Sequence, residues 1–280
     1  MQANLTATIK SHKLQLLVIL ALLGALYYPI IPLWVSELYT DPNYSHGFIV
    51  PLISGYFVYL RMAELNAAPV QPSNHGLWVL CGGLLLLVVA FVGTEYFTMR
   101  SSIIIISSGI ILYLFGKAVF RLLLLPLGYL FFTVPIPYII YDAVAFPLKL
   151  FITKYSVVML KLFGIIVWRE GNIIMFPNIE LEVADACSGI RSLVSLVALG
   201  VAFAYVTQDR NWKRAVLVAS AIPVSVFANG VRVVSTGVLA QYWGAKAAEG
   251  FFHEFAGIAV FALAIALLVG IGMILRRVGR

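Results

Sequence analysis

Charge is what this sequence most conspicuously lacks: of its 280 residues, 11% are Asp, Glu, Lys or Arg, whereas 62% are hydrophobic. A soluble globular chain has about a quarter of its residues charged. Together with a mean hydropathy of +0.98, this scarcity excludes a soluble globular protein and predicts an integral membrane protein. No linker rich in Gly, Ser or charge divides the chain, so we expect one transmembrane domain over residues 1–280.

Cysteine and histidine are also scarce, with two and four residues. Two cysteines cannot build a disulfide framework, and Cys81, inside an apolar run, is interpreted as a packing residue. Neither HExxH nor CxxC spacing occurs, so we predict no metal site and no cofactor. The net charge of +7 comes with no basic patch of interleaved aromatics, which argues against nucleic acid and leaves the lipid bilayer as the expected partner.

Long apolar runs are what the chain does contain, and a span needs about 20 mostly apolar residues. The sequence therefore predicts an all-α polytopic bundle of about eight transmembrane helices. The predicted spans are 14–34, 46–62, 76–93, 101–116, 119–135, 188–206, 214–232 and 254–275.

The segment 143–167 is long enough to cross a membrane but carries Lys149, Lys154 and Lys161. Each lysine near the middle of a span would cost about 2.5 kcal/mol or more. A helix lying in the interface keeps such lysines hydrated while its apolar face is buried. We therefore predict an outer interfacial helix over 143–167.

Positive residues cluster at the N-terminus, in the loop 207–214 and in the tail after residue 275. Basic loops stay on the cytoplasmic side, so eight spans place both termini and this loop in the cytoplasm, and a ninth would break the parity. The same parity puts Cys187, Arg232 and His253 at the outer ends of their spans, where 214–232 is expected to end at Arg232.

A small extracytoplasmic β-hairpin is predicted over 172–184. Apolar and polar residues alternate over 179–184, which is the period of a strand, and Pro177-Asn178 is a turn signal. Strands at 172–176 and 179–184 would lead the chain into the segment that carries Cys187.

Cys187 lies in the nine-residue string Asp185–Leu193, where a polar segment enters an apolar run. A thiolate is the attacking form of cysteine, and a neighbouring cation stabilises it. Arg191 follows four residues later on the same helical face. Arg232 is a further cation and a candidate oxyanion donor, and His253 is a candidate proton carrier. Ser188 is expected to cap the helix.

Two further polar positions are candidate supporting residues. Asn229 lies close to Arg232 within an apolar run, and intramembrane polar groups mark functional sites; Asn229-Gly230 is also expected to break the span. His46, at the outer end of the second span, is interpreted as an interfacial side chain or a substrate contact. The alternative roles are structural: Arg232 would snorkel to the interface and His253 would cap the last helix.

Three strings of this sequence resemble the exosortase/archaeosortase family: Ala186–Ser192, Asn229–Arg232 and the histidine before the last span, His253. The strings Tyr44–Pro51 and Pro135–Pro137 are similar to its exosortase branch. The resemblance covers about residues 40–275. It implies a multi-pass protein of the bacterial inner membrane with its active site on the periplasmic side.

The resemblance also implies an activity, that of a cysteine transpeptidase or protease. Its substrates are membrane-anchored proteins with a C-terminal sorting signal: a Pro-Glu-Pro motif, a transmembrane helix and a basic tail. Cys187 would be the nucleophile, Arg232 the catalytic arginine and His253 the catalytic histidine. Arg191, Ser188 and Gly189 belong to the cysteine string as supporting residues. The acceptor would be an exopolysaccharide, a lipid-linked group or water.

Two other functions remain open from the residues alone. A transporter or polysaccharide-export component would use Arg232 as an anion site and would tolerate loss of the thiol. A structural membrane scaffold would need Cys187, Arg232 and His253 only for stability.

Overall fold

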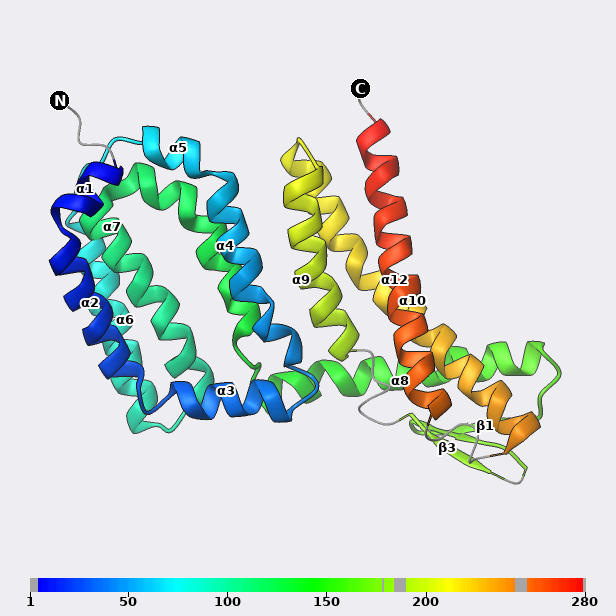
Figure 1. The fold of residues 1–280 in the computed structure, drawn as a ribbon. Helices are drawn as coiled ribbons and strands as arrows, with labels where there is room; N and C mark the ends of the chain where they lie inside the picture. The colour runs from blue at the N-terminus through cyan, green and yellow to red at the C-terminus, as the bar shows by residue number, and fades with distance from the viewer. Residues whose placement is uncertain (1–4, 178, 184–189, 245–250, 279–280) are drawn as a thin grey trace. The chain divides into compact units, whose positions relative to one another are not determined.

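The computed structural model describes residues 5–177, 179–183, 190–244 and 251–278, with the backbone alone at 190 and 251–255. The chain divides into two compact units, Met1–Ile136 (unit 1) and Pro137–Arg280 (unit 2). Each unit is described by itself. Both consist mainly of helices, as Figure 1 shows.

The described part of unit 1 contains helices and no β-strand. They are α1 (Leu5–Ser11), α2 (Lys13–Tyr27), α3 (Ile31–Thr40), η1 (Ser45–Phe48), α4 (Val50–Leu60), α5 (Met62–Ala67), α6 (His75–Val92), α7 (Tyr96–Tyr129) and η2 (Leu130–Thr133). The predicted continuous span 14–34 is wrong, because α2 ends at Tyr27 and α3 starts as a separate helix at Ile31. Pro29 and Pro32 explain the break, because a proline inside a helix removes a backbone hydrogen bond and clashes with the preceding turn.

The predicted spans 101–116 and 119–135 correspond to two helical segments that meet at a kink at Gly116 within α7, the second continuing into η2. Gly116 has φ +84°, and a Cβ there would lie 1.8 Å from the carbonyl oxygen of Gln71. Only glycine tolerates both the backbone angle and this close approach. The sequence thus identified the position at which the two helical segments of α7 meet.

Glycines also allow α6 and α7 to pack with their backbones almost touching. A Cβ on Gly76 would lie 2.2 Å from the Tyr113 nitrogen, and one on Gly109 would lie 2.5 Å from the Leu80 nitrogen. Small residues at such contacts are typical of helix pairs in membranes. Cys81 lies on the exposed side of α6, so the packing role expected for it is wrong.

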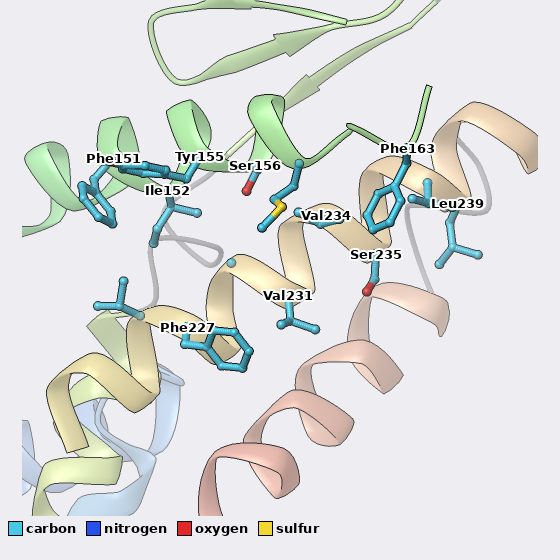
Figure 2. Close-up of a pocket in the computed structure, with 14 residues that line it drawn as sticks. Phe151, Ile152, Tyr155, Ser156, Phe163, Phe227, Val231, Val234, Ser235 and Leu239 are labelled. Atoms are coloured by element: carbon cyan, nitrogen blue, oxygen red, sulfur yellow. The ribbon is translucent and has the colours of Figure 1, made fainter. Parts of the chain in front are cut away.

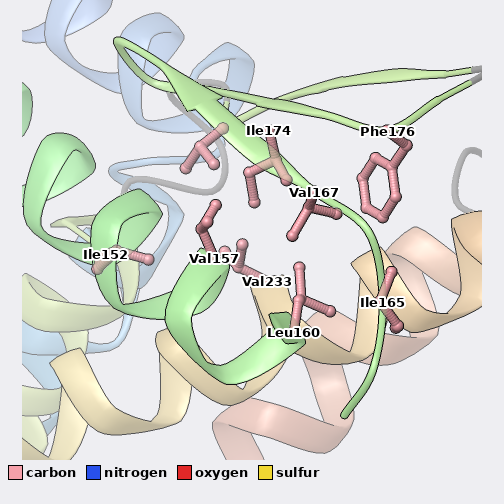
Figure 3. Packing of buried hydrophobic residues seen from close by; sticks show 9 residues of the cluster. Ile152, Val157, Leu160, Ile165, Val167, Ile174, Phe176 and Val233 are labelled. Carbon is pink, nitrogen blue, oxygen red and sulfur yellow. The ribbon is translucent and has the colours of Figure 1, made fainter. Parts of the chain in front are cut away.

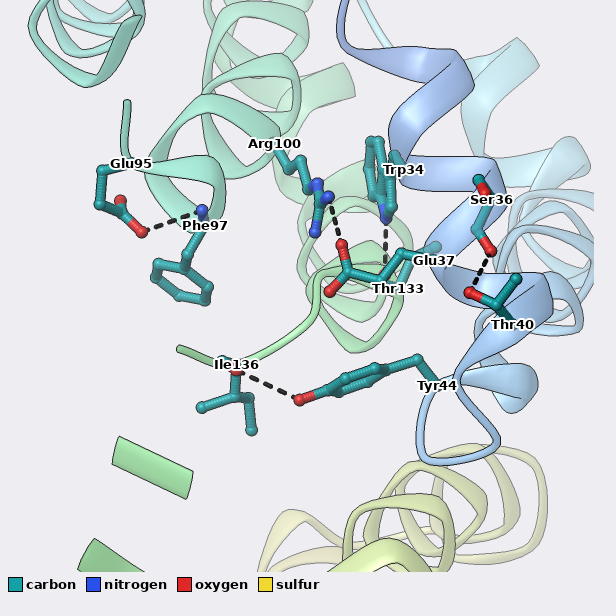
Figure 4. Close-up of polar contacts among 10 residues, drawn as sticks. All are labelled: Trp34, Ser36, Glu37, Thr40, Tyr44, Glu95, Phe97, Arg100, Thr133 and Ile136. Atoms are coloured by element: carbon teal, nitrogen blue, oxygen red, sulfur yellow. Dashed lines mark hydrogen bonds and ion pairs between the residues drawn. The ribbon is translucent and has the colours of Figure 1, made fainter. Parts of the chain in front are cut away.

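Buried polar contacts join α3 to α7 in unit 1 (Figure 4). Arg100 is 2% exposed and its Nη2 donates to Glu37 Oε2 at 2.5 Å. Trp34 Nε1 donates to the carbonyl oxygen of Thr133. Glu95 caps α7 by accepting hydrogen bonds from the Phe97 and Thr98 backbone nitrogens.

Unit 2 begins with α8 (Tyr138–Leu162), followed by the strands β1 (Trp168–Glu170), β2 (Ile173–Met175) and β3 (Glu180–Glu182). It continues with α9 (Ile190–Thr207), α10 (Asn211–Trp243) and α12 (Phe251–Arg277). The strands form an antiparallel sheet in the order β1-β2-β3. The β2–β3 pair, with Ile174 opposite Leu181, is the predicted hairpin, to which β1 adds a third strand.

The core of unit 2 near the sheet joins three elements, as Figure 3 shows. Leu160 of α8, Ile174 of β2 and Val233 of α10 are all buried in this cluster. The sheet therefore packs against α8 and the C-terminal half of α10. Figure 1 also shows α8 running across the direction of α9 and α12.

Five of the described helices are long and apolar enough to cross a membrane, or six if the pair α1 and α2, bent by 79°, counts as one span. Two shorter apolar helices, Ser45–Leu60 and Arg191–Thr207, coincide with further predicted spans. A polytopic all-α membrane protein is thereby confirmed, while the count of eight stays a prediction. Because α8 also meets the length and hydropathy criteria, its interfacial placement stays a prediction too.

Candidate functional site

The candidate site lies in the three-helix bundle of α9, α10 and α12. One contact shows which residues of the three helices lie at the same height along the bundle. A Cβ on Gly200 of α9 would lie 3.5 Å from Ala221 Cβ on α10 and 3.8 Å from a Leu268 methyl carbon on α12. These three residues therefore lie at the same level of the bundle. On the side toward the start of α9, Ser192 Oγ lies 3.3 Å from Ser225 Oγ of α10. Residue numbers rise in α10 as they fall in α9, so the two helices are antiparallel.

Arg232 of α10 faces α12. A Cβ on Gly257 would lie 3.5 Å from Arg232 Nη2 and 3.7 Å from Cζ, so the guanidinium lies directly against the α12 backbone at this glycine. Arg232 is half-buried there. His253 precedes Gly257 by four residues in the same helix, which is about one turn on the same face. The backbone of α12 thus places position 253 one turn from the guanidinium.

The ends of the helices can be compared by counting residues from the shared level. Arg232 is eleven residues beyond Ala221, and Gly257 is eleven residues before Leu268, which is about 16 Å in each helix. The first residue of α9, Ile190, lies two residues, or about 3 Å, before Ser192, whereas Arg232 lies seven residues, or about 10 Å, beyond the Ser225 that Ser192 contacts. The N-terminal end of α9 therefore lies at the same end of the bundle as Arg232 and Gly257.

Polar residues on α10 form a stripe that faces the bundle. Ser225, Asn229, Arg232 and Thr236 recur at intervals of four, three and four residues, which keeps them on one side of a helix. Ser225, Asn229 and Thr236 are 2%, 3% and 8% exposed. Polar side chains enclosed in so apolar a helix are costly and mark functional positions in membrane proteins.

Cys187, Ser188 and Gly189 lie outside the described residues. His253 is described by its backbone alone. Arg191, four residues after Cys187 in sequence, is the second residue of α9 and is half-buried. The structure thus brings together the start of α9, Arg232 and the first turns of α12. The meeting of the three reacting side chains stays a prediction.

Two sequence predictions about α10 are wrong. The helix does not end at Arg232 but continues for eleven more residues to Trp243, and Asn229-Gly230 does not break it. Glycine weakens a helix by only about 1 kcal/mol, and the burial of Val233, Gly237 and Ala240 offsets that cost. Asn211 to Arg232 covers about 31 Å, so Arg232 still lies one membrane thickness from the start of α10.

His46 belongs to unit 1, in η1, where it is half-buried and both ring nitrogens are covered. The two units are described separately, so the substrate contact proposed for His46 stays a prediction. The predicted Tyr44–Pro51 string surrounds it: Gly47 packs against Leu38, and Tyr44 Oη donates to the carbonyl oxygen of Ile136.

Sequence reasoning missed three members of this region. Ser225 and Thr236 complete the α10 stripe. Their spacing from Arg232, seven and four residues, indicates from the sequence that they share its helix face. Gly257 offered no such signal, because its role depends on the helix opposite. Among the described residues, no group of three or more His, Cys, Asp or Glu is placed to hold a metal.

Comparisons with known proteins give one match. The family model described as transmembrane exosortase matches residues 34–270, which is most of the chain. Searches of curated proteins and of solved structures found no match. The matched range contains every residue assigned to the candidate site.

Proposed function

Because the chain belongs to the transmembrane exosortase family, we propose that it is a membrane-embedded cysteine transpeptidase or protease. Its substrates would be exported proteins with a C-terminal sorting signal of the Pro-Glu-Pro type. The observation that supports this most is the contact between the Arg232 guanidinium and Gly257, one turn from His253 and at the same end of the bundle as the start of α9.

In the proposed reaction His253 takes the proton of the Cys187 thiol. The resulting thiolate attacks the carbonyl carbon of the scissile peptide bond. The carbonyl oxygen becomes an oxyanion, and Arg232 donates hydrogen bonds to it. Arginine suits this role because its guanidinium stays charged in proteins and cannot act as a base. Arg191 would hold the thiolate before attack.

Collapse of the oxyanion breaks the C–N bond, and His253 returns the proton to the departing amine. The apolar anchor and basic tail leave, and the exported part stays on Cys187 as a thioester. An acceptor nucleophile, from an exopolysaccharide, a lipid-linked group or water, then attacks the thioester and frees the thiol. Ser188 and Gly189 would shape the turn before α9, and Asn229 and His46 would contact the substrate.

The proposed setting is the bacterial inner membrane, with both termini in the cytoplasm and the reacting groups on the periplasmic side. The basic loop between α9 and α10 supports this, since Arg210, Lys213 and Arg214 lie at the opposite end of the bundle from Arg232. In that arrangement the thiol is at the outer interface, where a scissile bond next to a transmembrane helix would emerge.

Co-expression with a tagged sorting-signal protein tests the proposal. We expect the parent chain to cleave it and to form a thioester adduct sensitive to hydroxylamine. Cys187→Ala should leave the chain folded in the membrane and reduce cleavage to background, because no other group supplies the nucleophile. Processing that continues in Cys187→Ala would contradict the mechanism and favour a transporter or export role with an anion site at Arg232.

A further inference from the structure

An apolar groove of about 750 Å³ runs between α8 and α10 in unit 2 (Figure 2). Its walls are aliphatic and aromatic, with three hydroxyl groups and no charged side chain. The lining consists of Phe151, Ile152, Tyr155, Ser156, Met159 and Phe163 on α8, and of Val226, Phe227, Gly230, Val231, Val234, Ser235, Val238 and Leu239 on α10. Within the described part of unit 2, this is a large opening beside the helix that carries Arg232.

Both walls present their side chains in rows spaced by four residues. On α8 the row is Phe151, Tyr155, Met159 and Phe163, each about half exposed or more. On α10 the row is Phe227, Val231, Ser235 and Leu239. Rows of this spacing are the ridges between which another helix packs its own side chains. The groove thus has the surface pattern of a helix-binding site rather than of a smooth cavity.

The small residues that line the groove include Gly230 on α10 and Ser156 on α8. A Cβ at Gly230 would meet no atom within 4 Å, so this point of α10 is open to close approach. Ser156 is 2% exposed, and its Oγ lacks a hydrogen-bond partner among the described residues while pointing into the groove. A buried hydroxyl without a hydrogen-bond partner is destabilising, and an occupant with an accepting atom would remove that cost.

We propose that this groove binds the apolar helix of the membrane-anchored substrate, an inference that rests on the proposed function. Small residues let two helix backbones approach, and a backbone carbonyl of the incoming helix can then accept from Ser156. A lipid acyl chain carries no acceptor along its length and would leave that hydroxyl unsatisfied. Because Val231 and Ser235 lie on either side of Arg232 in sequence, a helix held here runs beside the reacting end of the bundle.

Site-specific photocrosslinking tests the occupant. The probe amino acid replaces Phe227, which is 60% exposed in the groove, or Ile222, which is 52% exposed on α10 outside it. Both chains also carry Cys187→Ala, so that the substrate is retained. With a tagged protein ending in a Pro-Glu-Pro motif, an apolar helix and a basic tail, we expect a crosslink to its helix from position 227 and at least tenfold less from 222.

A filling variant tests the same groove without a probe. Gly230→Leu adds a side chain into open space and also favours the helix, so the chain should fold. We expect substrate retained by Cys187→Ala to fall about tenfold or more with Gly230→Leu. Gly270→Leu on α12, where an added Cβ also meets nothing within 4 Å, is the matched control and should change retention less than twofold.

The groove proposal is overturned if position 227 crosslinks only to lipid or to a second copy of this chain. It is equally overturned if Gly230→Leu retains substrate like its control. Cleavage that depends on Cys187 in the parent chain, seen together with either result, leaves the proposed function standing and removes only the groove. Cleavage without dependence on Cys187 removes the proposed function itself.

Discussion

Each unit of this protein places an arginine in an apolar helix, and the two are held in opposite ways. Arg100 of unit 1 is 2% exposed, with Glu37 at 2.5 Å and the ring of Tyr96 5.6 Å from its Cζ. Arg232 of unit 2 is half-buried and its guanidinium lies against Gly257, a residue without a side chain. Arg100 is enclosed by the side chains of Glu37 and Tyr96, whereas Arg232 faces a helix position that has no side chain.

This difference is the one expected between a structural cation and the reactive cation proposed for Arg232. A charge sealed against a carboxylate stabilises the fold only while the pair is intact, and it cannot approach a substrate. A guanidinium at the edge of a bundle, at the end where α9 starts, can donate to an oxyanion that forms there. Loss of Arg100's partner should therefore change stability, and loss of Arg232 should change activity.

The largest effect is expected at the unit 1 ion pair. Glu37→Gln leaves the Arg100 charge buried without its carboxylate, which should lower the free energy of unfolding by about 3–5 kcal/mol. Thermal unfolding of the detergent-solubilised protein would measure this. The double variant Glu37→Gln/Arg100→Met removes the stranded charge and should recover much of the loss. A double variant as unstable as the single one would contradict the comparison.

Arg232→Gln should act on the reaction instead. The loss of one donor to an oxyanion lowers the rate by about 10²–10³-fold, while the thermal unfolding temperature should stay near that of the parent. Cleavage of the tagged sorting-signal protein, measured per mole of folded chain, would show this. A fall in unfolding temperature equal to that of Glu37→Gln would make Arg232 a structural residue and remove the contrast between the two units.

The sequence predicts the parts of this arrangement that depend on residues close to one another in the chain. Helix α6 and the β2–β3 hairpin were predictable, because apolar runs, strand alternation and turn residues act within a few neighbours. Arg100 and Glu37 lie 63 residues apart in different helices. No local pattern links them, so the pair emerges only once α3 and α7 are packed.

The predicted end of α10 at Arg232 is wrong because packing overrides a pattern of neighbouring residues. Asn229-Gly230 and a charged residue are typical of a helix end when read alone. Burial of Val233 against α8 and the sheet carries the helix on to Trp243. The types and the order of the candidate reacting residues come from the sequence, and their roles stay a prediction. The contact between Arg232 and Gly257 was not, because a glycine opposite a guanidinium is a property of two helices.

Gly257 offers a smaller and more specific test of the site. Gly257→Ala adds one carbon at 3.5 Å from Arg232 Nη2, an ordinary contact, and should leave cleavage near the parent rate. Gly257→Leu should push the guanidinium away and lower cleavage by about tenfold, because a displacement of about 1 Å in a catalytic group can cost up to 10²-fold. Gly270→Leu in the same helix is the control. Equal activity of Gly257→Leu and Gly270→Leu would show that Arg232 is not positioned by this contact.

The smallest expected effect is at the start of α7, beside Arg100. Burial raises the pKa of the Glu95 carboxyl, but hydrogen bonds from Thr98 and Phe97 and the charge of Arg100 outweigh it, so its pKa lies below the usual value. The stability from this cap is present above the unfolded pKa of about 4.3 and is lost as pH falls through the lower folded pKa. Glu95→Ala should lower the free energy of unfolding at pH 7 by about 1 kcal/mol, and the gap from the parent should close in acid. Thermal unfolding from pH 7 to pH 3 measures this. A gap unchanged at pH 3 would mean that the carboxylate does not cap α7, and that Arg100 has Glu37 as its main acidic partner.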